Sequence, residues 1–301
     1  MKKRLVVLMM VMFLLFSAYL SLCEEKRIYN DGVIDYVPLT ASFVLEGWDS
    51  ESSLQKIQYS IDGAPLDEYT EPLSMSTEGR HIIVYRAVDT TGNISNERVY
   101  SVVVDGTPPE GLVSADGPVY RREGDFFLTT ETAVVIWAED TLSGVDTIWV
   151  GLDDGEYMAY TGPVVIGKEG YHTARTFAVD NVGNRSKTYK VSGYVDSTPP
   201  EVEIVRKVPF VDVNDENYTN RSNEYSVIAT DEISGVREIW ISLDNSKWVR
   251  YTGPFTVQIP GMHSLRARAS DNLGNVSEPA EVTFYVDIVP PETTLGTSLE
   301  E

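Results

Sequence analysis

The sequence predicts an all-β protein: three tandem immunoglobulin-like β-sandwich domains in an elongated array, after an N-terminal signal segment. Two phrases, Asp-x-x-Gly-Asn and Asp-x-x-Pro-Pro, each occur three times, and each copy lies 91 residues after the previous one. That period is too long for a solenoid unit and suits a whole small domain. Between the phrases, short β-prone segments alternate with turn residues, and helical periodicity of useful length is absent.

The two phrases set the boundaries of the repeat. The first supplies the structural repeat residues Asp89, Gly92, Asn93, Asp180, Gly183, Asn184, Asp271, Gly274 and Asn275. The second starts at Asp105, Asp196 and Asp287 and contains the Pro-Pro links. We therefore expect a signal segment at 1–23, module 1 at 24–107, module 2 at 108–198, module 3 at 199–289 and a flexible tail at 290–301.

The N-terminus has the pattern of an export signal. Met1-Lys2-Lys3-Arg4 is basic, and Leu5 to Leu22 is an uncharged apolar run. Cleavage before Glu24 is one outcome. A bacterial lipobox, with Cys23 lipidated, is a second, and an uncleaved membrane anchor is a third. We expect an exported protein of the cell envelope, on the outer-membrane surface or in the periplasm.

Charge and cysteine content narrow the class of protein. The formal net charge is −22, and such a surface repels nucleic acid and anionic lipid headgroups. It also keeps an extended protein soluble. Cys23 is the only cysteine, so the modules have no internal disulfide and depend on packing for stability.

Module 3 shows the strand pattern best. Glu224 to Thr230 is β-prone and is followed by a loop. Val236 to Leu243 then alternates, with Ile239, Ile241 and Leu243 on one face and Glu238, Trp240 and Ser242 on the other. Asp244-Asn245 predicts a tight turn. A strand from His263 to Ser270 follows, and then the Asp-x-x-Gly-Asn turn, which closes the hairpin to the last strand.

These motifs carry a resemblance to a known family. Ser-Gly-Val, Tyr-Thr-Gly-Pro, Gly-x-His, Asp-x-x-Gly-Asn and Asp-x-x-Pro-Pro together resemble the exported bacterial immunoglobulin-like repeats, and in particular the repeat family named after a leptospiral outer-membrane surface protein. The likeness covers about residues 36–292. That family carries the label "β-barrel", but charged residues such as Arg237, Glu238, Arg266 and Arg268 among short alternations favour strands with one buried face.

Two sets of residues suggest metal ligands. His81, His172 and His263 share one repeat position, Gly-x-His, but lie in different modules, so a structural role at the strand start is favoured over a metal site. Asp105, Asp196 and Asp287 at the module junctions are candidate calcium ligands. No Asp-x-Asp run accompanies them and Pro-Pro follows directly, so a turn or strand-end role is favoured.

Trp149 and Trp240 are candidate ligand residues, because outward aromatic rings can stack on glycans. The alternative is internal pairing with Arg175 and Arg266 on the neighbouring strand. Signatures of catalysis, such as His-Glu-x-x-His, Gly-x-Ser-x-Gly and phosphate loops, are missing.

Three hypotheses follow, and none requires a cofactor. The first is a non-catalytic envelope or surface protein, a stiff rod of modules for adhesion, ligand presentation or spacing. The second is carbohydrate or cell-wall binding through the tryptophans, and the third is an accessory subunit of an exported enzyme. The expected partner is an unknown protein or glycan at the envelope, with no nucleic acid and with membrane contact only through the N-terminal segment or a lipid on Cys23.

Overall fold

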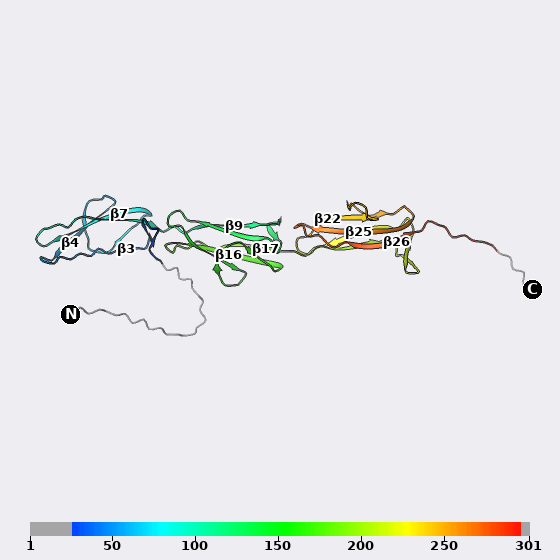
Figure 1. Cartoon of the computed structure of the whole chain (residues 1–301), viewed down its shortest axis with the longest axis horizontal. Helices are drawn as coiled ribbons and strands as arrows, with labels where there is room; N and C mark the ends of the chain where they lie inside the picture. The colour runs from blue at the N-terminus through cyan, green and yellow to red at the C-terminus, as the bar shows by residue number, and fades with distance from the viewer. Residues whose placement is uncertain (1–25, 296–301) are drawn as a thin grey trace, which may run out of the picture. The chain divides into compact units, whose positions relative to one another are not determined.

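The computed structural model describes residues 26–295, and all regular secondary structure in them is β-strand (Figure 1). The expected signal segment and Cys23 lie outside the described residues, as does the end of the expected tail. Residues 26–295 contain no helix with the length and apolar character that a membrane span requires.

Module 1 contains one large and one small sheet. The large sheet has the order β1-β2-β8-β7-β4-β5, and β3 pairs with β6 in the small one. Their bounds are β1 (Tyr29–Asn30), β2 (Asp35–Pro38), β3 (Ser42–Phe43), β4 (Leu54–Ile61), β5 (Asp67–Glu68), β6 (Leu73–Ser74), β7 (Gly79–Asp89) and β8 (Arg98–Asp105).

Module 2 repeats this arrangement with a fuller second sheet. The six-stranded sheet has the order β10-β11-β17-β16-β13-β14, and the other sheet has the order β15-β12-β9. Their bounds are β9 (Glu110–Asp116), β10 (Val119–Arg122), β11 (Asp125–Leu128), β12 (Ala133–Glu139), β13 (Val145–Leu152), β14 (Met158–Ala159), β15 (Val164–Val165), β16 (Gly170–Asp180) and β17 (Tyr189–Val195).

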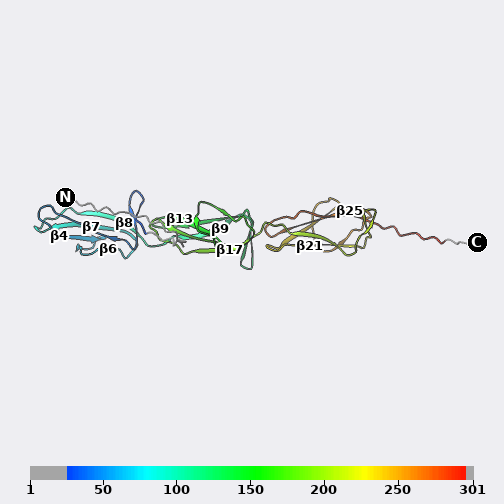
Figure 2. The ribbon, with the colours of Figure 1, turned by 90° about the horizontal axis from the view of Figure 1, so that it is seen from below.

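Module 3 has the same plan. Its sheets have the orders β19-β20-β26-β25-β22-β23 and β18-β21-β24, and Figure 2 shows β21 and β25 in separate layers. The bounds are β18 (Glu201–Arg206), β19 (Val211–Val213), β20 (Glu216–Thr219), β21 (Glu224–Thr230), β22 (Val236–Leu243), β23 (Val249–Arg250), β24 (Phe255–Thr256), β25 (Gly261–Asp271) and β26 (Ala280–Val286).

The protein is therefore built of tandem β-sandwich domains, as the sequence predicts. Within each module β-pairing is mostly antiparallel, but an early strand runs parallel to the last one: β2 beside β8, β11 beside β17 and β20 beside β26. A pair of sheets with one buried face each encloses a core about 10 Å thick. In module 3 that core contains the buried side chains of Tyr225, Val257, Leu265, Phe284 and Val286.

The predicted strands of module 3 are confirmed. β21 and β22 have the predicted bounds, and the strand expected at His263 to Ser270 is one or two residues longer at each end. Alternation explains β21, in which Tyr225 and Val227 are buried and Ile228 is exposed. The Asp-x-x-Gly-Asn turn follows β7, β16 and β25, with Gly92, Gly183 and Gly274 at positive φ as the motif predicts.

The chain also divides into two compact units that do not follow the repeat. Of the described residues, the first comprises 26–110, Glu139–Asp146 and Ala178–Ser186, so it includes two loops of module 2. The second comprises Gly111–Ala138, Thr147–Phe177 and 187–295. Those loops join the first unit because Ser143 and Asn184 bind the linker residue Asp105. The repeat-based domain boundaries stay a prediction.

Candidate functional site

Three carboxylates meet at the linker between modules 1 and 2. Asp105 ends β8, Asp140 follows β12 and Asp180 ends β16, and one oxygen of each lies within 4.8 Å of the others. Asp105 and Asp180 are fully buried, and Asp140 is half-buried. All three belong to the first compact unit. We call them the first acidic cluster.

Amide donors hold these carboxylates in place. The Asp105 carboxylate accepts hydrogen bonds from the N–H groups of Thr107 (3.1 Å) and Ser143 (3.0 Å). The Asp180 carboxylate accepts from the amide of Asn184 (2.7 Å), whose side-chain Nδ2 donates to Asp180 Oδ2 (2.7 Å) and to the Asp105 carbonyl (3.1 Å). The Asn side chain therefore joins the turn of module 2 to the linker.

The same cluster recurs 91 residues later, inside the second compact unit. Asp196, Asp231 and Asp271 place one oxygen each within 4.8 Å of the others, with the same burial pattern. The N–H of Ser234 donates to Asp196 (3.0 Å), and Asn275 Nδ2 donates to the Asp196 carbonyl (3.3 Å) and to Asp271 Oδ2 (2.6 Å). We call this set the second acidic cluster.

Burial and mutual repulsion raise the pKa of three carboxyls in these clusters, those of Asp140, Asp180 and Asp231. Desolvation is the largest cause for Asp140, Asp180 and Asp231, and the nearby charges of Asp105 or Asp196 add to it. In module 1 the corresponding turn carboxyl, Asp89, has the opposite shift: hydrogen bonds from Asn93, Ser52 and Thr91 outweigh desolvation and lower its pKa. In modules 2 and 3 burial therefore makes the charged form of these three carboxyls less favourable.

The sequence identified only part of this site. Asp105 and Asp196 lie in the clusters, and Asp180 and Asp271, which the sequence places in turns, lie beside them. Among residues 26–295, Asp287 belongs to neither cluster and is exposed. Asp140 and Asp231 were missed, although their 91-residue spacing was a signal that could have revealed them.

The repeated histidines bind turn carboxylates. Nδ1 of His81, His172 and His263 lies 2.7, 2.9 and 2.8 Å from the Oδ2 atom of an Asp that starts the tight turn after β4, β13 and β22; these are Asp62, Asp153 and Asp244. The other oxygen of each carboxylate accepts the amide of the residue that follows the histidine. Each His–Asp pair therefore fastens a turn to the strand next to it.

The linkers are held by glutamates as well as by proline geometry. Glu78 accepts hydrogen bonds from the Gly106 amide (2.9 Å) and the Thr107 hydroxyl. Glu169 binds the Ser197 amide (2.9 Å) and the Thr198 hydroxyl in the same way. The third copy has Pro260 in place of this glutamate.

The tryptophans contact other side chains of their own modules. Trp149 and Trp240 are half-buried; Trp149 stacks on Phe177, with ring centroids 6.2 Å apart. The guanidinium of Arg268, rather than that of the predicted Arg266, lies over Trp240, because Trp240 and Arg268 are partners in the β22–β25 pairing. Arg266 lies over Trp248 instead, and Arg175 lies over Tyr157.

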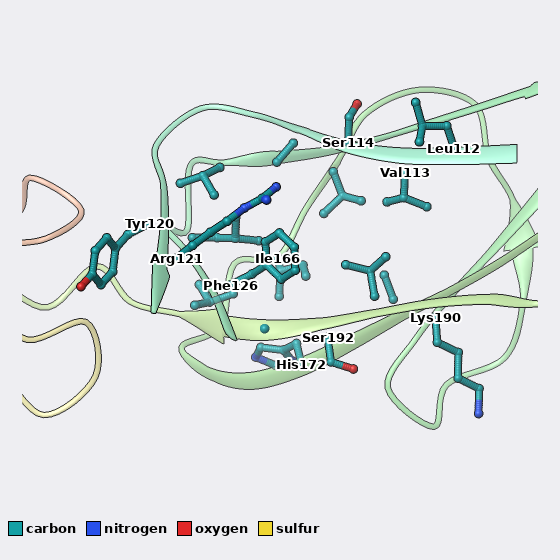
Figure 3. A pocket seen from close by; sticks show the side chains of 18 residues that line it. Leu112, Val113, Ser114, Tyr120, Arg121, Phe126, Ile166, His172, Lys190 and Ser192 are labelled. Atoms are coloured by element: carbon teal, nitrogen blue, oxygen red, sulfur yellow. The ribbon is translucent and has the colours of Figure 1, made fainter. Parts of the chain in front are cut away.

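Module 2 also contains a cavity of about 940 Å³ (Figure 3). β9 forms one wall, and β11, β16 and β17 form the other. The repeat explains it, because three large core residues of module 3 have small counterparts here. Tyr225, Leu265 and Phe284 correspond to Val134, Ala174 and Gly193, and all three of these line the cavity.

His172 contributes a polar group to the cavity wall. Its Nε2 is buried without a hydrogen-bond partner among the described residues. In modules 1 and 3 the same atom lies 3.0 Å from the Thr77 carbonyl and 2.8 Å from the Ile259 carbonyl. In Figure 3 the side chains of Tyr120 and Lys190 point away from the centre of the cavity, so most of its lining is apolar.

Comparison with known proteins gives distant structural similarity alone. No family model matches the chain, and no curated protein is significantly similar in sequence. The fibronectin(III)-like modules of CbhA from Clostridium thermocellum are 17% identical with a TM-score of 0.33, over 58% of this chain and 94% of theirs. The FN1-FN3 domains of chicken CNTN1 are 12% identical with a TM-score of 0.28, over 79% of this chain and 90% of theirs.

A third similar structure is the dimeric latent PorU from Porphyromonas gingivalis, which is 14% identical with a TM-score of 0.24. The match covers 78% of this chain but only 30% of PorU, so this chain spans under a third of that protein. The narrower resemblance to the leptospiral repeat family stays a prediction.

Proposed function

We propose that this chain is a non-catalytic, exported protein of the cell envelope, in which immunoglobulin-like modules present or space an interaction surface. One observation supports this most directly. The polar residues that recur in all three modules bind their own scaffold: the Asp-x-x-Gly-Asn carboxylates bind turn amides, and the histidines bind turn carboxylates. The resemblance to exported bacterial repeats and the signal-like N-terminus agree with it.

Protease accessibility on intact cells tests the location. Intact cells that produce the protein are treated with trypsin, and the chain is followed with an antibody, next to a periplasmic protein of the same cells. We expect digestion of this chain while the periplasmic protein is spared. If the chain is cut only after the outer membrane is permeabilised, the surface role is wrong and a periplasmic spacing role replaces it.

Carbohydrate binding is the second candidate function. Trp149 and Trp240 are half-buried, so part of each residue stays accessible to solvent. An aromatic ring in this position can stack on a sugar face. A glycan array probed with the unaltered chain and with Trp240→Ala tests this role. We expect a signal that the substitution removes, and binding unaffected by Trp240→Ala would exclude this tryptophan as the platform.

A further inference from the structure

The acidic clusters have a natural comparison within the chain, because module 1 carries only part of the set. The positions that correspond to Asp140 and Asp180 are Asp49 and Asp89, but the position 91 residues before Asp105 is Leu14. Module 1 therefore has two of the three aspartates. Modules 2 and 3 have all three, since the preceding linker supplies the third.

One repeat position beside the aspartates is a serine in all three modules, and its hydroxyl differs between modules in whether it binds the carboxylates. In module 1 the Ser52 hydroxyl oxygen lies 3.2 Å from Asp49 Oδ1 and 2.9 Å from Asp89 Oδ2, so it bridges the two carboxylates. In module 3 the equivalent hydroxyl, on Ser234, lies 3.4 Å from Asp231 Oδ1. In modules 1 and 3 the side chain at this repeat position is thus directed at the carboxylates.

In module 2 the equivalent hydroxyl is left without a partner. Ser143 is 5% exposed, its amide donates to Asp105 Oδ2, and yet its Oγ is buried with no hydrogen-bond partner in the described part of the chain. A buried hydroxyl without a partner costs free energy, so native structures rarely contain one unless a ligand or water completes the site.

We propose that each acidic cluster binds one hard divalent cation of the calcium type. The ligands are Asp105, Asp140 and Asp180 with the Ser143 hydroxyl in the first cluster, and Asp196, Asp231 and Asp271 in the second. The amides of Leu142 and Gly144 donate to Oδ1 of Asp140, and the Gly235 amide and the Ser234 hydroxyl donate to Oδ1 of Asp231. In the proposal Oδ2 of each of these two carboxylates binds the cation.

The chemistry of the ligand atoms indicates which kind of ion the clusters bind. All donors are oxygens, three of them from carboxylates, and hard cations such as Ca²⁺ prefer oxygen ligands and accept irregular geometry completed by water. Zinc favours nitrogen and sulfur donors, which these clusters lack. The carboxylates come from a linker and from two loops of the next module, so a bound ion joins three separate segments at each junction.

Module 1 is not expected to bind an ion. Its two carboxylates are already bridged by Ser52, and Asp89 also accepts from Thr91 and Asn93. The rival explanation for modules 2 and 3 is that each cluster instead holds a proton, which would relieve the repulsion without any metal.

Calcium titration of the chain distinguishes the two explanations. The protein, freed of metal with a chelator, is titrated with CaCl₂ by calorimetry at neutral pH, with MgCl₂ as a comparison. We expect two ions per chain. Asp140→Asn and Asp231→Asn should each remove one ion, the double variant should bind none, and the matched control Asp49→Asn should keep both. One ion or none for the unaltered chain, or two for the double variant, would overturn the proposal.

A milder variant covers the case in which Asp140→Asn fails to fold. Ser143→Ala removes one proposed ligand and keeps the charge of the cluster. We expect its first site to weaken by about tenfold, on the scale seen for groups that support a metal site, with the second site unchanged. Circular dichroism verifies folding. A folded Ser143→Ala variant whose first site binds calcium as tightly as that of the unaltered chain would show that the hydroxyl is not a ligand.

Discussion

At the scale of single residues, the carboxylates of turn residues hold neighbouring strands together, a role that a disulfide or a longer turn has in other small β-domains. Each of the turn residues Asp62, Asp153 and Asp244 lies at positive φ and binds both a histidine ring and a strand amide. Asp tolerates that conformation because its short side chain can bind backbone nearby. The histidine therefore recurs in each module because it binds the aspartate of the adjacent tight turn.

The His81–Asp62 pair should give stability a defined pH window. The hydrogen bond that His81 donates to the Asp62 carboxylate is the largest cause that raises the pKa of His81. The stability that this raised pKa contributes is present below the ordinary histidine value of about 6.5 and is lost as pH rises through the raised value. Hydrogen bonds from the Ile82 amide and His81 lower the pKa of Asp62. The stability that this lowered pKa contributes is present above the ordinary pKa of an aspartate and is lost as pH falls through the lowered pKa.

We therefore expect Asp62→Asn to destabilise module 1 most between about pH 4 and 6.5 and less above the raised histidine pKa. The loss should be about 0.5–1 kcal/mol, because nearly half of the Asp62 side chain is exposed and solvent screens the pair. Urea unfolding at several pH values measures it. Asp67→Asn, at an exposed carboxylate of the same module, is the control; a loss that does not vary with pH would contradict the pair's role.

At the scale of the elements, the same strand plan tolerates very different cores. The module 3 core is dominated by stacked aromatics, with the rings of Tyr225 and Phe284 4.7 Å apart. In module 2 the counterpart of Phe284 is Gly193, and a Cβ there would lie 2.7 Å from the Phe126 carbonyl oxygen. The close approach of β11 therefore requires glycine, and this glycine is one of the three small residues that leave the cavity open.

Filling this cavity should stabilise module 2. Ala174→Leu restores the residue that module 3 has at Leu265, and Ala174 is buried and lines the cavity. We expect a gain of about 1–2 kcal/mol, from the transfer of the three added carbons out of water less the entropy lost when the longer side chain is ordered. The reciprocal change, Leu265→Ala, should cost about 2–5 kcal/mol in module 3.

Calorimetric unfolding of the full chain, with hydrogen exchange to assign each transition to a module, measures both changes. Three modules need not unfold as one two-state unit, so the assignment matters. If Ala174→Leu destabilises module 2 while Leu265→Ala destabilises module 3 as expected, the module 2 core has no room for a larger side chain.

The elements also show how far the sequence alone could reach. β21 and β22 were predictable because alternation and flanking turn residues act locally along the chain. The acidic clusters were not, because Asp105, Asp140 and Asp180 come from three separate segments and only the pairing of the strands brings them together. The repeat pointed to the linker aspartates but equally to Asp287, which has no following loops in residues 26–295 to complete a cluster.

At the scale of the whole molecule, the chain has a formal net charge of −22, and some of its aspartate side chains are buried. Surface carboxylates favour solubility, whereas buried clusters cost free energy unless something compensates them. The acidic clusters recur at both linkers, and so do the glutamates that bind the linker amides, Glu78 and Glu169. This recurrence indicates that the linkers are ordered parts of the fold.

Amide exchange at the linkers tests this order. The Gly106 and Ser197 amides donate to Glu78 and Glu169, whereas the third copy has Pro260 at the glutamate position, so we expect slow exchange at the first two linkers and fast exchange at Ile288. Glu169→Ala should speed exchange at Ser197 by about tenfold, the effect of losing one hydrogen bond of roughly 1.4 kcal/mol, and leave Gly106 unchanged. Glu78→Ala should do the reverse. If Ile288 exchanges as slowly as Ser197, proline geometry alone orders these linkers and the glutamates add nothing.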